Sequence, residues 1–253
     1  MVETKASILE APTVYNFGGS GGGGGTGFTV TDFNGIEYEI KDYIKLAPVN
    51  GYAPFYAMIN NGVAYDDTYI FDFQLNKFSG GESYKTLLQR KATVGGYNRN
   101  FADGIGILLN FSPSGYFRIM GANAGNAAIG EVYTKLCNNA EIVDGTKYRL
   151  TIKNGSISID PSLSGAQWYA PNFKNVALSS LRLLGDNDTL SGSGIFEFPF
   201  YSFIVLDNAD KLKFNYRPAK RLNDGKIGFM DLVNIVFYSG TYSDENLDKI
   251  ELG

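Results

Sequence analysis

The chain has 253 residues, of which 44% are hydrophobic, enough to fill the core of one large domain. Its 22 basic and 26 acidic side chains give a net charge of −4, which argues against binding to nucleic acid by phosphate neutralisation. The absence of histidine excludes Ser-His-Asp and Cys-His catalysis, and the single cysteine, Cys137, excludes an intrachain disulfide. With no apolar run that suits a signal peptide or a membrane helix, we expect a soluble protein that is made in the cytoplasm and not secreted by the usual route.

The first 34 residues differ in composition from the rest. Residues 1–17 are predicted to be an anchor peptide, because their apolar side chains are too few for a core but suffice to dock on a partner protein: Ile8, Leu9, Val14, Tyr15 and Phe17. Residues 18–34 are predicted to be a linker, because eight of its first ten residues are glycine. The alternative is a disordered tail without a partner.

Residues 35–253 are predicted to form one domain of short antiparallel strands. Aromatic and β-branched residues predict a strand at 68–75, and the turn residues at 112–115 and 154–155 predict hairpins over 104–120 and 148–160. Further strands are predicted at 36–45, 52–59, 85–92, 131–136, 179–184, 195–206, 211–216, 226–230 and 235–238. No long segment has the apolar stripe of an amphipathic helix, so we expect an all-β antiparallel sandwich.

The C-terminal third carries a recognisable pattern. An aromatic strand at 198–208 precedes a segment with Arg217-Pro218-Ala219, and Asp224-Gly225-Lys226-Ile227-Gly228 leads to Val236-Phe237-Tyr238. Over residues 195–238 this pattern resembles the end of concanavalin A-like (laminin-G-like) jelly-roll domains of bacteriophage and prophage structural proteins. The resemblance implies a jelly-roll β-sandwich preceded by the extended Gly-rich tail.

The resemblance also implies a function. It predicts a virion structural protein, such as a fibre, decoration or adsorption protein, whose lectin-like head faces outward and binds host surface glycans. The partners expected are other virion proteins, through the N-terminal tail, and further copies of the chain, with a trimer as the expected oligomer. The alternative is a free carbohydrate-binding or glucanase-like protein.

Three groups of side chains are candidate sites. Exposed aromatic residues beside planar polar groups suit sugar binding, which points to Tyr97, Asn98, Arg99, Trp168 and Tyr169, although Trp168 and Tyr169 also suit the end of a core. Loop oxygens of Asp66-Asp67 and Asp186-Asn187-Asp188 suit calcium, but such clusters more often shape turns, so no metal or cofactor is predicted.

Glu37 and Glu39 have the same-face spacing of a glycosidase carboxylate pair. They lie on the first predicted strand, where a solvated acidic face of an edge strand explains them better than catalysis does. The chain is therefore predicted not to be an enzyme.

The anchor interpretation leads to the first test. Deletion of residues 1–17 is expected to leave the melting temperature unchanged, because the deleted residues build no core, and to abolish incorporation into assembled particles. Calorimetry and analysis of purified particles measure the two effects. Normal incorporation of the truncated chain would refute the anchor.

Overall fold

The computed structural model describes most of the predicted domain. The described residues are 27–47, 54–59, 63, 67–77, 83–90, 106–111, 116–121, 132–138, 141–153, 156–163, 181–184 and 196–253. The anchor residues Ile8, Leu9, Val14, Tyr15 and Phe17 lie outside them.

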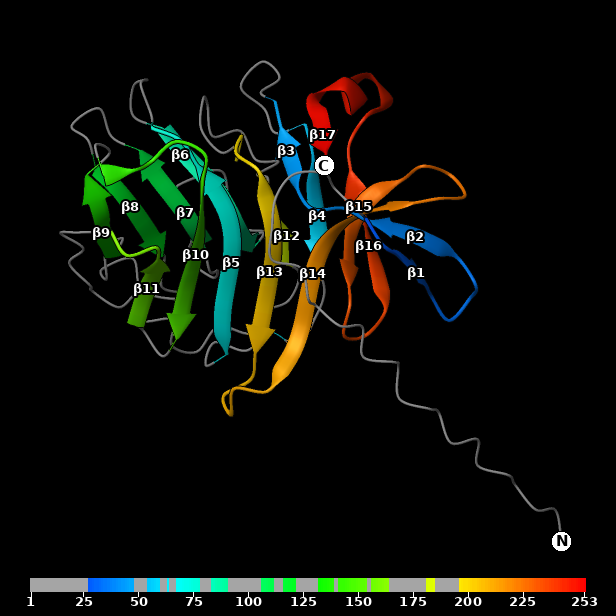
Figure 1. The fold of residues 1–253 in the computed structure, drawn as a ribbon, viewed down its shortest axis with the longest axis horizontal. Helices are drawn as coiled ribbons and strands as arrows, with labels where there is room; N and C mark the ends of the chain where they lie inside the picture. The colour runs from blue at the N-terminus through cyan, green and yellow to red at the C-terminus, as the bar shows by residue number, and fades with distance from the viewer. Residues whose placement is uncertain are drawn as a thin grey trace, which may run out of the picture.

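The strands form two layers (Figure 1), and each strand pairs antiparallel with its neighbours. The first layer contains, in spatial order, β11 (Ser156–Asp160), β10 (Thr146–Lys153), β5 (Thr68–Leu75), β13 (Phe200–Leu206), β14 (Leu212–Arg221), β15 (Ile227–Asp231) and β16 (Val236–Thr241). The second layer contains β4 (Tyr56–Ile59), β12 (Leu181–Leu183), β6 (Ser83–Arg90), β7 (Gly106–Phe111), β8 (Tyr116–Gly121) and β9 (Val132–Asn138).

Strand β16 joins the layers, because its first part pairs with β15 and its end, Gly240–Thr241, pairs with β4. Four short strands and a 3₁₀ helix complete the described fold: β1 (Thr29–Thr31), β2 (Glu37–Ile40), β3 (Ile44–Leu46), β17 (Ile250–Leu252) and η2 (Asp244–Lys249). The predicted all-β antiparallel sandwich is thus confirmed.

Alternation along the strands of the first layer places aromatic rings in the core. In β5, Tyr69, Phe71 and Phe73 are buried, whereas the residues between them are only partly buried. The ring of Phe203 in β13 lies 4.6 Å from the ring of Phe71 and 5.7 Å from that of Tyr216 in β14, both nearly parallel to it. This stack fixes three adjacent strands against one another.

A β-bulge interrupts the pairing of β13 with β5. Phe200 pairs with Phe73 and Ser202 with Asp72, so Tyr201 is an extra residue in β13. Phe200 is fully buried, whereas the hydroxyls of Tyr201 and Ser202 both bond to outward-facing side chains of β5. The bulge therefore presents two consecutive side chains on the outer face, which regular alternation forbids.

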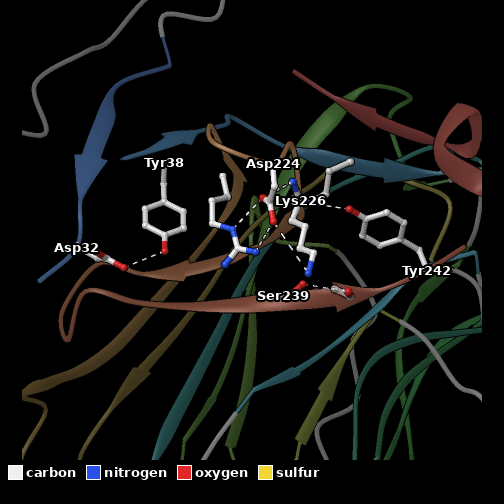
Figure 2. A network of polar contacts seen from close by, with 9 residues as sticks. Asp32, Tyr38, Asp224, Lys226, Ser239 and Tyr242 are labelled. Atoms are coloured by element: carbon white, nitrogen blue, oxygen red, sulfur yellow. Dashed lines mark hydrogen bonds and ion pairs between the residues drawn. The ribbon is translucent and has the colours of Figure 1, made fainter. Parts of the chain in front are cut away.

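The glycine-containing motif at 224–228 builds the turn between β14 and β15 (Figure 2). The Arg221 side chain bonds both carboxylate oxygens of Asp224, and Gly225 adopts a φ of 74°. A Cβ on Gly228 would lie 2.2 Å from the carbonyl oxygen of Tyr238, so only glycine fits there.

Two tyrosine hydroxyls make hydrogen bonds near this turn. The Tyr38 hydroxyl donates to Asp32 at 2.9 Å, and the Tyr242 hydroxyl accepts from the Ile227 amide at 2.9 Å.

Most predicted strands coincide with observed ones. The segment 68–75 matches β5, and the hairpins over 104–120 and 148–160 correspond to β7–β8 and β10–β11. The predicted strand 36–45 divides into β2 and β3. The short strands β1 and β17 were not predicted, and β1 lies within the predicted linker 18–34, although it pairs with β2 and so belongs to the sheet.

Truncation of the stacked ring tests the role of the aromatic core. Phe203→Ala is expected to lower the free energy of unfolding by about 3–5 kcal/mol, because it leaves a cavity between Phe71 and Tyr216. Phe33→Ala is the control, since Phe33 is 81% exposed, and its effect is expected to stay within about 0.5 kcal/mol. Equal effects in urea denaturation would contradict the stack as the main contact between β5, β13 and β14.

Candidate functional site

The structure describes few of the residues proposed from sequence. Tyr97, Asn98, Arg99, Trp168, Tyr169, Asp66 and the segment 186–188 all lie outside the described residues. Asp67 is described: it is 3% exposed, and its carboxylate accepts a hydrogen bond from the Lys213 Nζ at 2.9 Å. Asp67 therefore forms an ion pair with Lys213 of β14, in which the carboxylate is buried.

Glu37 and Glu39 are on β2, as expected for a partly solvated acidic face. Glu37 is exposed, and Glu39 pairs with the Lys41 Nζ at 2.7 Å. However, β2 is not an edge strand, because β1 pairs with one side of it and β14 with the other. The edge-strand interpretation was therefore wrong.

A cluster of polar and aromatic side chains lies instead on the outer face of the first layer. Its members come from β5, β10, β13, β14 and the segment between β2 and β3, and we call them the outer patch: Asp42, Tyr43, Asp72, Gln74, Lys147, Arg149, Tyr201, Ser202 and Arg217. Figure 1 shows the four strands side by side.

Asp72 is the central carboxylate of the outer patch. Arg149 donates to its two oxygens from Nε at 2.7 Å and from Nη2 at 2.8 Å, and the Ser202 hydroxyl donates at 2.7 Å. Burial opposes ionisation of Asp72, but these hydrogen bonds and the charges of Arg149 and Lys147 outweigh it and lower the pKa of the carboxyl. Asp72 is therefore an anion at neutral pH and is unsuited to act as a general acid.

Tyr201 supplies the aromatic centre of the outer patch. The Lys147 Nζ lies 3.7 Å from the centre of its ring, and the ring of Tyr43 meets it edge-on at 6.0 Å. The Tyr201 hydroxyl donates to the Gln74 Oε1 at 3.2 Å. Burial, and to a lesser degree the charge of Asp42, raises the pKa of Tyr201, so its hydroxyl stays neutral.

Two further cations are held in a partly desolvated setting. Burial lowers the pKa of Arg217, against the charges of Asp42 and Asp72, which favour its protonated form. Burial also lowers the pKa of Lys147, and among the neighbouring charges Arg217 acts in the same direction. The Arg217 Nε is buried and, among the described residues, has no hydrogen-bond partner.

Tyr43 connects the outer patch to a second ion pair. Its hydroxyl donates to the Glu251 Oε1 at 2.6 Å, and the Lys45 Nζ donates to the other carboxylate oxygen at 3.1 Å. The hydrogen bond to Glu251 and burial raise the pKa of Tyr43 to about 12. These contacts fix the Tyr43 ring at the border of the outer patch.

Sequence analysis missed the outer patch because its members are far apart in the chain. Asp72 is 77 residues from Arg149 and 130 from Ser202, and only the strand order brings them together. The available signal was the polar half of each alternation, Asp72 and Gln74 in β5 and Lys147 and Arg149 in β10. The bulge at Tyr201 in β13 follows no alternation pattern that the sequence could have shown.

The outer patch has the chemistry of a polar ligand site. It offers carboxylate, amide, hydroxyl and guanidinium groups beside two tyrosine rings. Across the described residues, no group of three or more His, Cys, Asp or Glu side chains is placed to hold a metal ion. Within the same residues, no helix is long and apolar enough to cross a membrane.

Comparisons with known proteins give only distant likenesses. No protein-family model matches the chain, and no curated protein does. Among solved structures, the enzymatically active domain of tailspike protein 2 from bacteriophage CBA120 is 14% identical, with a TM-score of 0.45, and the match covers 72% of this chain and 27% of that one. Full-length tailspike protein 2 from the Escherichia coli O157:H7 bacteriophage CAB120 is 13% identical over the same shares, with a TM-score of 0.42. The chain thus spans about a quarter of the length of these proteins.

The prediction that the chain is not an enzyme needs correction. The first of these structures is an enzymatically active domain, which contradicts that prediction, and we do not retain it.

The Asp72–Arg149 pair leads to a prediction on stability. Asp72→Asn is expected to lower the free energy of unfolding at pH 7 by about 1–2 kcal/mol, because the charge-assisted bonds from Arg149 are lost. Since the folded pKa of Asp72 is lowered, its contribution is present above its ordinary pKa and is lost as the pH falls through the folded value. The difference between wild type and variant should therefore shrink in urea denaturation at acid pH.

Asp210→Asn is the matched control. Asp210 pairs with Lys153, which is on β10 like Arg149, but the Asp210 side chain is more than half exposed. Its effect is expected to stay below about 0.5 kcal/mol. A difference for Asp72→Asn that persists unchanged at acid pH would show that the ionised pair is not its source.

Proposed function

We propose that the chain is a protein of a bacteriophage particle and that its outer patch binds polysaccharide on the host surface. The phage assignment is supported by the sequence pattern of residues 195–238. The same segment contains β13 to β16 and contributes Tyr201, Ser202 and Arg217 to the outer patch. The N-terminal residues 1–17 would then join the head to other particle proteins, and the heads would assemble as an oligomer.

The observation that carries the binding proposal is the setting of Tyr201. The bulge turns its ring outward among Gln74, Lys147 and the edge of Tyr43. Sugars present apolar C–H faces that pack on such rings and hydroxyls that bond to planar polar groups nearby. The outer patch offers both within one sheet face.

A sheet face also suits a polymer better than a small metabolite. Seven of the nine members of the outer patch come from four adjacent strands, and all nine except Ser202 are exposed or partly buried, with Arg149 54% exposed in its side chain. An extended chain of sugar units can lie across such strands and contact several of these groups at once, so that weak single contacts add up.

The proposal predicts that Tyr201 contributes to binding. In a binding assay on immobilised bacterial capsular and O-antigen polysaccharides, Tyr201→Ala is expected to weaken binding of the bound polymer about tenfold, because a stacking ring is lost. Lys153→Gln is the matched control, since Lys153 is on the same layer but pairs with Asp210 away from the outer patch. Thermal unfolding of both variants verifies that they are folded.

Unchanged binding by folded Tyr201→Ala would place the glycan elsewhere on the chain. Binding to no polysaccharide at all would refute the proposed function. Absence of the chain from purified phage particles, with glycan binding intact, would favour the alternative of a free carbohydrate-binding protein.

A further inference from the structure

We infer that the glycan of the outer patch is acidic and that Arg217 pairs with a carboxylate of its sugar units. This inference rests on the proposed function and adds the chemical class of the ligand. It follows from how the charges of the outer patch are satisfied.

Each cation of the outer patch except Arg217 already has a direct partner. Arg149 donates two hydrogen bonds, one to each carboxylate oxygen of Asp72, at 2.7 and 2.8 Å. Lys147 lies over the Tyr201 ring, 3.7 Å from its centre. A ligand anion gains little from a guanidinium that is already held by a carboxylate.

Arg217 is different. It follows Tyr216, whose ring is in the core, so the side chain of Arg217 lies on the opposite, outer face of β14. Its Nε is buried with no hydrogen-bond partner among the described residues. Asp42 and Asp72 act on it through their charges, but among the described contacts the carboxylate of Asp72 bonds Arg149 and Ser202.

The terminal nitrogens of Arg217 also have no hydrogen bond among the described contacts, and a half-buried guanidinium without such bonds gains free energy when a ligand acceptor meets these nitrogens. A carboxylate fits best, because a guanidinium offers parallel N–H groups that match its two oxygens. The charge balance agrees: Lys147, Arg149 and Arg217 face Asp42 and Asp72, which leaves one positive charge, and a uronate carries one negative charge. The attraction is local, since the whole chain has a net charge of −4.

The rest of the outer patch suits the neutral part of such a sugar. Gln74 provides an amide for the hydroxyl groups of the sugar, and Tyr201 provides a ring. Arg217 is half-buried, and this partly desolvated setting strengthens an ion pair relative to one on the open surface.

The test uses the full chain and three acidic polymers, polygalacturonate, hyaluronate and polysialate, each paired with its carboxyl-reduced form. Titration calorimetry measures binding at equal low salt. At least one acidic polymer is expected to bind, and carboxyl reduction is expected to weaken that binding about tenfold or more. Arg217→Gln should cause a similar loss for the acidic form and leave binding of the reduced form unchanged, with Arg217→Lys between the two.

Arg221→Gln is the matched control, because Arg221 lies on the same strand but pairs with Asp224 in the β14–β15 turn. It should retain the preference for the acidic polymer, and thermal unfolding of each variant verifies folding. Binding that survives carboxyl reduction, or a preference that survives Arg217→Gln, would overturn this inference while the proposed function stands. Binding of none of these polymers, nor of the neutral bacterial polysaccharides, would refute both.

Discussion

The register between β5 and β13 is the constraint on which the rest of the structure depends. Inside the sandwich it is held by Phe203, whose ring stacks on Phe71 of β5 and on Tyr216 of β14. Because side chains alternate along a strand, this inner packing also decides which side chains meet on the outer face. The contact of Ser202 with Asp72 is a consequence of where Phe203 is packed.

The bulge adds what alternation alone cannot provide. Without the extra residue in β13, either Tyr201 or Ser202 would point into the core. With it, the Tyr201 ring and the buried Ser202 hydroxyl both lie on the outer side of the sheet, the ring beside Gln74 and the hydroxyl on Asp72. Asp72 is then satisfied by Arg149 and Ser202, and Arg217 is left without a hydrogen-bonded carboxylate among the described residues. The core packing, the outer patch and the ligand class proposed for it are thus linked by one pairing register.

The elements of the fold were predictable, but the candidate site was not. Local signals, such as the aromatic alternation of 68–75 and the Asn154-Gly155 turn, act over a few residues and gave β5 and the β10–β11 hairpin correctly. The outer patch depends on strand order, which pairs Asp72 with Arg149 and Ser202 across long stretches of chain. Sugar-binding groups were therefore predicted in loops, at residues such as Tyr97 and Arg99, because exposure is easier to predict for loops than for one face of a sheet.

The central claim is that the outer face of the first layer contacts the glycan. Chemical-shift mapping by NMR, with an oligosaccharide cut from a polymer that the chain binds, tests it most directly. The claim predicts that the largest changes fall on the backbone amides of Asp72, Lys147, Arg149, Tyr201, Ser202 and Arg217, which four strands bring together. Changes confined to the second layer, or to residues away from the outer face of the first layer, would contradict it.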